Sequence, residues 1–291
     1  MDKEKIAIER LKAASEMSLA YYKQPLVVTD SGGKDSSVIK ELALRADIPV
    51  EFMHSHTTAD APETVYFIRS EFKRLEELGK KCVVTMPTYK GKPVTMWSLI
   101  PQKLLPPTRL VRYCCAVLKE PGGAGRFIAT GVRWAESISR KKNRAIYERQ
   151  HKDPEKRILL NNDNDDKRML FESCRLQAKR VVNPIVDWSD EDVWAFIHDA
   201  EIPINPLYKE GQCRVGCIGC PMAGTSGREA AFLRWPTYKQ AYIRAFERMI
   251  EAREYRGLTS TWKTGQDVFN WWMEYDVLPG QMEFEDEDLE V

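Results

Sequence analysis

A short run of small, hydroxyl and charged residues near the start of the chain is suited to binding phosphate. From Ser31 to Ser37 it reads Ser-Gly-Gly-Lys-Asp-Ser-Ser, between an apolar stretch and a segment whose apolar residues recur at helical spacing. Adjacent glycines let the backbone turn tightly and approach a ligand. A helix that begins near Asp35 directs unpaired N–H groups into the loop, and Lys34 adds a cation that can follow charge onto a leaving pyrophosphate. We therefore predict a phosphate-binding loop for a nucleotide.

Five of the seven cysteines gather in two places that could supply metal ligands. One is the adjacent pair Cys114 and Cys115, and the other is the Cys-x3-Cys-x2-Cys run of Cys213, Cys217 and Cys220. Closely spaced thiolates with glycines between them suit zinc or an iron-sulfur cluster. Neither loop has a complete set, so we expect the two loops to meet in space. A structural zinc ion, chance grouping and the similarly spaced radical-SAM signature are the alternatives.

The elements that must position these residues alternate along the first 200 residues. An N-terminal helix ends near Tyr22, strands are predicted at 26–28, 50–54, 82–86 and 127–130, and helices at 36–46, 62–78 and after Ser189. Such alternation implies parallel strands joined by helical crossovers. Ligands of these sheets bind at the carboxyl ends of the strands, where Ser31, Thr57 and Gly131 all fall. Cys82, inside a strand, is predicted to be a core residue.

The remainder of the chain divides into an insertion and a C-terminal part. Residues from about 141 to 180 break the alternation, and we interpret them as a surface insertion or lid, in which Cys174 is an incidental thiol. Two more helices are predicted, at about 228–256 and 265–275. The predicted domains are one at 1–222 that includes the insertion, a helical extension at 223–282, and an acidic tail at 283–291.

The composition is that of an ordinary soluble protein, with 43% hydrophobic and 30% charged residues. The net charge of +1 argues against binding to nucleic acid through bulk charge alone. No apolar run approaches the roughly 20 residues needed to span a membrane. The first residues lead into an amphipathic segment and not into a secretory signal, so we expect a cytoplasmic protein without a membrane partner.

Several motifs together resemble one known family. The lysine of the loop is separated from Ser36 by Asp35, unlike in a Walker A motif, and S-G-G-x-D-S after a strand resembles the PP-loop of the adenine-nucleotide alpha-hydrolase superfamily. Within that superfamily, four further stretches resemble the phosphoadenylyl-sulfate (PAPS) and adenylyl-sulfate reductases. They are His56 to Thr64 (family D-T-G-x-x-F-P-E-T, here with His56 and Thr58 replacing Asp and Gly), Arg112 to Pro121, Thr130 to Arg140, and Asn183 to Trp194, followed by Asn205 to Cys220.

The resemblance implies a three-layer α/β fold with a parallel sheet of the PP-loop type and a helical C-terminal extension. It implies a four-iron, four-sulfur cluster held by Cys114, Cys115, Cys217 and Cys220, with Cys213 as a replacement ligand or a nearby thiol. The catalytic residues implied are Lys34, Asp35, Lys119, Arg133 and Arg140, whose cations would face phosphate or sulfate oxygens. The nucleotide-binding residues implied are Ser31, Gly32, Gly33, Lys34, Asp35, Ser36, Ser37, Thr57, Glu63 and Gly131.

Three functions are compatible with these motifs. The first is a sulfonucleotide reductase that converts the sulfuryl group of adenylyl sulfate or PAPS to sulfite with electrons from a thioredoxin-like thiol donor. The second is an ATP-dependent sulfurtransferase that uses Mg²⁺, takes sulfur from a cysteine desulfurase, and thiolates a nucleic acid such as DNA or tRNA. The third is a non-catalytic adenine-nucleotide sensor with a structural cluster. In each case we expect a homo-oligomer.

One departure from the family bears on the choice between these functions. The reductases carry a nucleophilic cysteine in a C-terminal E-C-G-L-H-type segment, whereas this sequence ends in an acidic run without cysteine. Cys174 and Cys213 are the candidate substitutes. The missing cysteine favours the sulfurtransferase, and the extent of the motif match favours the reductase.

Overall fold

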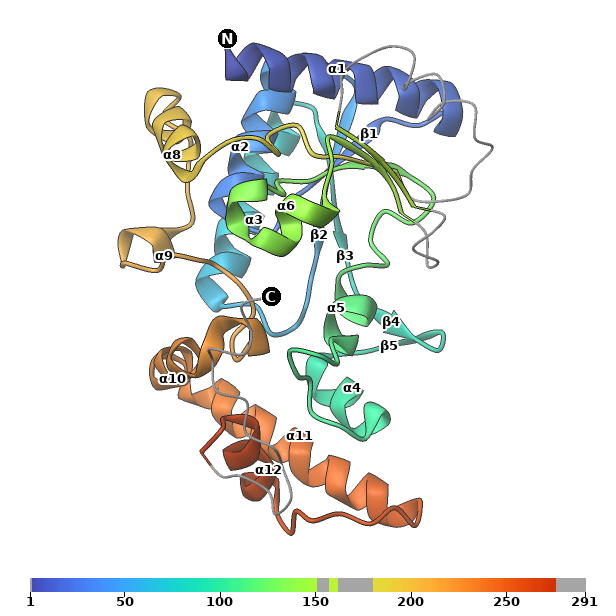
Figure 1. Ribbon diagram of the computed structural model, residues 1–291, viewed down its shortest axis with the longest axis vertical. Coiled ribbons are helices and arrows are strands. Elements are labelled where there is room, and N and C mark those ends of the chain that lie inside the picture. Colours follow the sequence, from blue (N-terminus) through green and yellow to red (C-terminus); the bar gives the residue numbers. More distant parts are fainter. Residues whose placement is uncertain (1, 151–156, 162–179, 276–291) are drawn as a thin grey trace. The chain divides into compact units, whose positions relative to one another are not determined.

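The computed structural model describes residues 2–150, 157–161 and 180–275, which fall into two units (Figure 1). Unit 1 comprises Met1–His56, Asp60–Met86 and Lys119–Gly216, and unit 2 comprises Thr57–Ala59, Pro87–Leu118 and Cys217–Val291. The predictions for Cys174 and for the acidic tail at 283–291 lie outside the described residues.

A seven-stranded sheet forms the centre of unit 1. Its strands in spatial order are β3 (Lys81–Thr85), β2 (Val50–Ser55), β1 (Leu26–Thr29), β6 (Phe127–Ala129), β9 (Arg180–Val182), β7 (Tyr147–Arg149) and β8 (Ile158–Leu160). The first five are parallel, while β7 pairs antiparallel with both β9 and β8. The predicted α/β fold with a mainly parallel sheet is confirmed. The sequence analysis interprets residues 141–180 as a surface insertion. The described part of this region adds the two antiparallel strands to the sheet, and Tyr147 and Glu148 of β7 are buried.

The strands form because short apolar runs can bury side chains on both faces of a sheet. In β1, Leu26 and Val28 belong to the large core cluster that includes residues of the flanking helices, whereas Val27 belongs to a smaller cluster with Met53, Ile128 and Val181. Successive side chains of a strand point to opposite faces, so these clusters mark the two sides of the sheet.

Helices flank the sheet of unit 1. They are α1 (Lys3–Tyr22), α2 (Lys34–Arg45), α3 (Pro62–Glu77), η1 (Trp134–Glu136), α6 (Ile138–Asn143), α8 (Asp190–Asp199) and α9 (Pro206–Lys209). Asp2 caps α1, and Ser189 with Asp192 forms a capping box at α8. Pro62 lies in the first turn of α3, where its missing N–H has no intrahelical acceptor. These helices confirm the corresponding sequence predictions.

Unit 2 is mainly helical. Its elements are a hairpin of β4 (Thr88–Tyr89) and β5 (Lys92–Pro93), and the helices α4 (Met96–Lys103), α5 (Tyr113–Leu118), η3 (Pro221–Ala223), α10 (Gly224–Arg234), α11 (Pro236–Tyr255) and α12 (Gly265–Trp272). The predicted single helix at 228–256 is wrong. Pro236 starts a new helix, and Trp235 before it has φ −121° and ψ 70°, because proline disfavours helical geometry in the preceding residue.

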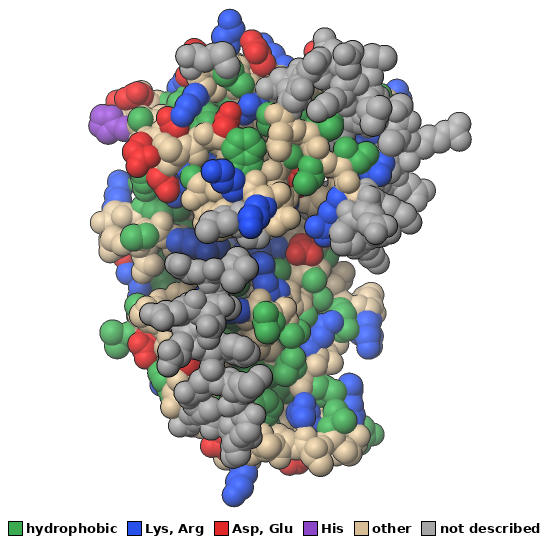
Figure 2. All heavy atoms as spheres, in the orientation of Figure 1, with side chains coloured by type: hydrophobic (Ala, Val, Ile, Leu, Met, Phe, Trp, Pro, Cys, Tyr) green, Lys and Arg blue, Asp and Glu red, His purple; other side chains and the backbone are tan. Residues whose placement is uncertain are grey.

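The surface carries both signs of charge. Lys and Arg side chains and acidic side chains are interspersed on the face seen in Figure 2, as the net charge of +1 suggests. None of the described helices is both long enough and apolar enough to cross a membrane.

Candidate functional site

The predicted phosphate-binding loop follows the strand at which the sheet changes direction. From β1 the chain continues to β2 and β3 on one side, while β6 and β9 lie on the other. Ligands of such sheets bind at the carboxyl ends of the strands at this switch point. Asp30 to Gly33 leave β1 there, and α2 begins at Lys34.

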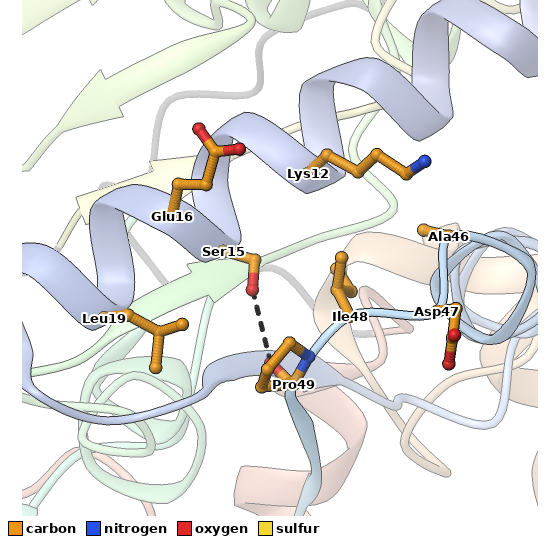
Figure 3. A pocket seen from close by; sticks show the side chains of 8 residues that line it. All are labelled: Lys12, Ser15, Glu16, Leu19, Ala46, Asp47, Ile48 and Pro49. Atoms are coloured by element: carbon orange, nitrogen blue, oxygen red, sulfur yellow. Dashed lines mark hydrogen bonds between the residues drawn. The ribbon is translucent and has the colours of Figure 1, made fainter.

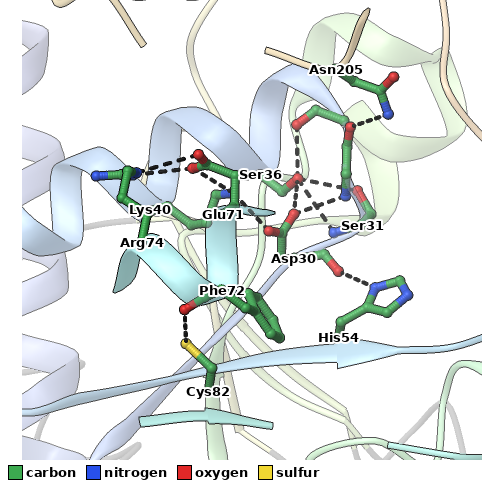
Figure 4. Close-up of polar contacts among 12 residues, drawn as sticks. Asp30, Ser31, Ser36, Lys40, His54, Glu71, Phe72, Arg74, Cys82 and Asn205 are labelled. Carbon is green, nitrogen blue, oxygen red and sulfur yellow. Dashed lines mark hydrogen bonds and ion pairs between the residues drawn. The ribbon is translucent and has the colours of Figure 1, made fainter. Parts of the chain in front are cut away.

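The Asp30 side chain holds the phosphate-binding loop in shape through hydrogen bonds and an ion pair (Figure 4). Its buried carboxylate accepts hydrogen bonds from the Gly32 N–H at 2.8 Å and the Ser36 hydroxyl at 3.0 Å, and it pairs with Lys40 Nζ at 2.7 Å. Burial by itself would raise the pKa of Asp30, but the Lys40 charge and these hydrogen bonds lower it below its ordinary value. Lys40 also lies 3.5 Å from the Glu71 carboxylate. The loop therefore begins on a buried, ionised anchor.

Two predicted nucleotide-binding glycines occupy positions that no other residue fits. Gly32 has φ +73°, and a Cβ there would lie 2.7 Å from the Thr64 side chain. A Cβ on Gly131, just after β6, would lie 2.8 Å from the backbone carbonyl carbon of Asp35. The segment after β6 thus packs directly against the first turn of α2.

A second line of contacts holds the loop from residues 205–208. The buried Asn205 side chain donates to the Gly32 carbonyl at 3.2 Å and to the Thr64 hydroxyl at 2.9 Å. The Lys34 N–H donates to the Tyr208 hydroxyl at 3.0 Å. Sequence reasoning assigned no role to Asn205 or Tyr208, although their Asn-Pro-Leu-Tyr segment was one of the matching motifs. The sequence signal for Asn205 is a polar side chain directly before Pro206, which starts a helix.

Arg133 is buried and directs its guanidinium at protein groups. It donates to the Asp35 carboxylate at 2.7 Å, to Asp190 at 2.8 Å and to the Trp188 carbonyl at 3.2 Å. Lys34 Nζ lies 3.1 Å from Asp190 and 3.7 Å from Asp35. Burial alone would raise the pKa of Asp190, but hydrogen bonds from Lys34 and Arg133 lower it. Sequence reasoning missed Asp190, which joins the two predicted catalytic cations.

The remaining predicted residues of unit 1 lie in different surroundings. Arg140 is half-buried and pairs with Glu136; burial lowers its pKa against the opposing charge of that carboxylate. Lys119 is exposed, and Glu63 lies in the first turn of α3. The Ser31 and Ser36 hydroxyls lie 3.3 Å apart, and Ser37 is buried.

The structure brings both cysteine loops together in unit 2. A hydrogen bond with Cys115, followed by burial, raises the pKa of the Cys114 thiol, and the nearby Cys217 and Cys220 raise it further. The Cys220 N–H donates to the Cys217 carbonyl at 3.2 Å, which folds the second loop tightly. The four thiols of Cys114, Cys115, Cys217 and Cys220 are called the cysteine cluster below.

Two polar groups of unit 2 contact the cysteine cluster. Arg112 donates to the Cys115 Sγ at 3.3 Å, and this contact raises the pKa of Arg112. The Cys217 Sγ lies 3.3 Å from the hydroxyl of Thr57, which is buried and also accepts from the Ala59 N–H. Thr57, predicted to bind nucleotide, is thus a neighbour of the cysteines. Arg112 had no assigned role in the sequence analysis.

Aromatic side chains support the cysteine cluster. The fully buried Tyr242 donates its hydroxyl to the Ile218 carbonyl at 3.0 Å, and its ring lies 4.9 Å from Trp97 and 4.7 Å from Trp272 between centroids. Burial raises the pKa of Tyr242 well above its ordinary value, and nearby thiols raise it further. The Ile218 N–H in turn donates to the Ala59 carbonyl at 2.8 Å.

Two other cysteines belong to unit 1. Cys213 belongs to unit 1, is exposed, and has its Sγ 4.0 Å from the Gly211 carbonyl. Cys82 in β3 is half-buried with its Sγ 3.7 Å from the Phe72 carbonyl, and burial raises its pKa to about 11. Cys82 therefore behaves as the core thiol that the sequence predicted.

A hollow of unit 1 lies apart from the predicted residues. It is bordered by one side of α1 and by the turn between α2 and β2, where the Ser15 hydroxyl donates to the Pro49 carbonyl at 3.5 Å (Figure 3). Its walls combine apolar side chains with Lys12, Glu16 and Asp47. None of the motif residues lines it, so it is not the candidate site.

Comparisons with known proteins agree with the motifs. Residues 25–223 match the phosphoadenosine phosphosulfate reductase domain family. An uncharacterized protein of Methanocaldococcus jannaschii is 28% identical over 228 residues, covering 76% of this chain and 46% of its own length. The adenosine 5'-phosphosulfate reductase of Allochromatium vinosum is 43% identical over 54 residues, covering 19% of this chain and 21% of its own length. This chain therefore matches less than half the length of these two curated relatives.

Among solved structures, the phosphoadenylyl-sulfate reductase of Candida auris is similar in fold. It is 17% identical, with a TM-score of 0.46, and the match covers 72% of this chain and 87% of that one.

Proposed function

Because the chain belongs to the phosphoadenosine phosphosulfate reductase domain family, we propose that it binds an adenine nucleotide at the loop after β1 and performs sulfur chemistry on it. The observation that carries the proposal is the braced loop itself. Gly32 has a left-handed conformation, Asp30 is a buried anchor whose pKa is lowered, and α2 begins at Lys34 directly after the loop. A tight loop at the start of a helix is a geometry suited to binding an anion.

The charged residues of unit 1 suggest how the loop would act on a nucleotide. Lys34 is the cation that can neutralise charge developing on a phosphate or sulfate oxygen. Asp190 and Asp35 orient its ammonium group, and the buried Arg133 orients both carboxylates. We assign Arg133 a positioning role, because its guanidinium donates to three protein groups. In the ATP reaction Asp35 would also be available to a Mg²⁺ ion.

The cysteine cluster fits a four-iron, four-sulfur group. A single tetrahedral zinc ion needs sulfurs about 3.8 Å apart, whereas among the described residues no three of these Sγ atoms lie within 4.8 Å of one another. The wider spacing, the adjacent Arg112 cation and the buried surroundings suit a larger anionic cluster. Cys114, Cys115, Cys217 and Cys220 would hold it, and it would supply electron density and charge stabilisation for the sulfur chemistry.

The reaction we favour is reduction of the sulfuryl group. Two thiols would deliver two electrons to sulfur, and the S–O bond to the nucleotide would break. Sulfite, a disulfide and AMP (from PAPS, adenosine 3′,5′-bisphosphate) would form with release of two protons. The attacking thiol would come from the exposed Cys213, from Cys174 or from a donor protein. The four clustered cysteines also suit the second candidate, in which ATP adenylates an oxygen of a nucleic acid with release of pyrophosphate, and the outer sulfur of a protein persulfide displaces AMP. A second thiol would then cleave the S–S bond, which leaves a protein disulfide and the thiolated nucleic acid.

The test is an anaerobic assay of the purified chain for iron and sulfide content, for pyrophosphate from ATP, and for sulfite from adenylyl sulfate and PAPS. Sulfite without pyrophosphate would identify a reductase. Pyrophosphate stimulated by DNA or tRNA would identify the sulfurtransferase. Nucleotide binding without either product would identify a sensor, and no nucleotide binding would contradict the proposal.

A variant at the loop makes this test specific. Lys34→Ala should lower turnover by about a hundredfold without changing the iron content, because Lys34 and the cysteines lie in different units. The matched control is Lys142→Ala, which removes an exposed lysine of α6. Equal activity in both variants would remove Lys34 from the mechanism.

A further inference from the structure

Three side chains of metal-ligand type converge in unit 1 at the carboxyl end of β2. One ligand atom each from His54, His56 and Asp60 all lie within 4.8 Å of one another, and in the described part of the chain this is the one such group of three or more. The His56 Nδ1 lies 3.5 Å from the Asp60 carboxylate. None of these residues belongs to the cysteine cluster or to the charged groups around Lys34.

The strand geometry accounts for this convergence. His54 and His56 are two residues apart in extended chain, so their side chains project to the same face. The register of β2 with β3 continues past the strand end, where the His56 N–H donates to the Thr85 carbonyl at 3.0 Å. Asp60 precedes α3, whose N-cap is Ala61. His54 therefore lies in β2 itself, and His56 and Asp60 lie in the short segment between β2 and α3.

His54 has the arrangement of a metal-binding histidine. It is 5% exposed, and its Nδ1 lies 2.8 Å from the backbone carbonyl of Asp30 (Figure 4). A carbonyl only accepts hydrogen bonds, so Nδ1 carries the proton and Nε2 carries the lone pair. The Nε2 atom is buried and has no hydrogen-bond partner among the described residues. Such a buried group needs a partner, and a carbonyl on the other ring nitrogen is the usual support for a histidine that binds a metal.

The chemistry of the three groups selects the ligand. Burial lowers the pKa of the His56 imidazole, and this effect outweighs the attraction of the Asp60 carboxylate. Two imidazole nitrogens and one carboxylate oxygen form a donor set for a first-row transition metal. We propose that His54, His56 and Asp60 bind a divalent ion such as Zn²⁺ or Fe²⁺, with open coordination positions for water or an anionic oxygen.

The site would be coupled to the phosphate-binding loop. His54 contacts the backbone of Asp30, whose side chain anchors Gly32 and Ser36. A metal ion on His54 would therefore stabilise the start of the loop through this one hydrogen bond. The inference does not depend on which sulfur reaction the protein performs.

The test is zinc binding to the full chain, measured by competition with a fluorescent chelator. His54→Ala and Asp60→Asn should each weaken binding by at least about tenfold. The matched control is His198→Ala, because His198 is an exposed histidine 3.7 Å from the Asp199 carboxylate without a third ligand. The control should bind like the wild type. Unchanged affinity in His54→Ala and Asp60→Asn would overturn the proposal.

X-ray absorption at the zinc edge separates this site from the cysteines without any substitution. The proposed site predicts nitrogen and oxygen neighbours with the outer-shell scattering of imidazole, and a shell of sulfur alone would overturn it. Zinc should also raise the melting temperature of the wild type and of His198→Ala, but not of Asp60→Asn. Failure of nucleotide binding would leave these results unaffected, so the two proposals are separately testable.

Discussion

The phosphate-binding loop of unit 1 and the cysteine cluster of unit 2 are held in shape by different interactions. Around the loop, buried ion pairs and hydrogen bonds connect Asp30 with Lys40 and Arg133 with Asp35. Around the cysteines, ring packing on Tyr242 supplies most of the support. Partners within the protein therefore satisfy the charged groups of the loop region. The cysteine region instead gathers four thiols, and there a hydrogen bond with Cys115, burial and the neighbouring thiols raise the pKa of Cys114.

These different interactions indicate which of the two regions depends on a bound ligand for its stability. The loop has an anion-binding shape of its own, so a nucleotide would find it preorganised. The cysteine cluster would reach its full stability only with a bound metal group, because positively charged metal ions favour the thiolate form of the ligands. Three substitutions test this comparison.

The largest effect is expected at the cysteine cluster. Cys217→Ser should abolish most iron binding and the iron-sulfur absorbance, because one of four ligands is lost, while nucleotide binding in unit 1 should persist. Iron analysis and nucleotide titration measure the two effects.

The control is Cys82→Ser, which changes a half-buried thiol outside the cluster. Full iron content in Cys217→Ser would contradict the ligand assignment. Loss of nucleotide binding in that variant would show that the two regions are not independent.

An intermediate effect is expected at the buried anchor of the loop. Asp30→Ala leaves the Lys40 ammonium, 2% exposed, with only the 3.5 Å contact to Glu71 among the pairs described. Breaking a buried pair costs about 3–5 kcal/mol in the free energy of unfolding. Urea unfolding of Asp30→Ala against Asp199→Ala, an exposed carboxylate, measures it.

The lowered pKa of Asp30 predicts how the effect of Asp30→Ala on stability changes with pH. The pKa of folded Asp30 is below its ordinary value, so its ionised form stabilises the fold fully above about pH 4, the pKa expected in the unfolded chain. This stabilisation is lost as pH falls through the folded pKa. The stability gap between wild type and Asp30→Ala should therefore be constant near neutrality and narrow only below about pH 4. A gap that narrows between pH 6 and 8 would exclude Asp30 as its source.

The smallest effect is expected at the outer support of the loop. Tyr208→Phe removes the hydroxyl that accepts from the Lys34 N–H but keeps the ring against Trp194. One such hydrogen bond contributes about 0.5–1.5 kcal/mol, so nucleotide affinity should fall only a few-fold. Tyr66→Phe, at an exposed position, is the control. A loss as large as that of Lys34→Ala would mean that Tyr208 contacts the nucleotide directly.

The sequence predicted local features well because they depend on local chemistry. The strand at Leu26, the loop glycines and the cap at Ser189 follow from apolar runs, tight turns and helix ends, and all are present. The helix break before Pro236 is equally local, because a proline disfavours helical geometry in the residue before it. The association of β7 and β8 with the sheet was not predictable, because short segments in a polar region carry no clear periodicity.

The sequence also predicts the candidate site only in part. The types and spacing of Lys34, Asp35 and the cysteines pointed to their chemistry, but the partners of these residues come from distant segments. Asp190 approaches Lys34 only through the fold, and the single hydrogen bond that orients His54 comes from a backbone carbonyl. The spacing of residues along the chain does not reveal such contacts.

The division of the chain into alternating segments has a consequence for its synthesis. The backbone passes between the two units five times, and the last segment of unit 2 starts only at Cys217. The parallel core strands of unit 1 are complete once Val182 has been made. During translation, about a hundred further residues must therefore be made after Cys114 and Cys115 before Cys217 and Cys220 emerge from the ribosome. Unit 1 can begin to fold on the nascent chain, whereas unit 2 can close only after the segment that begins at Cys217 has been made.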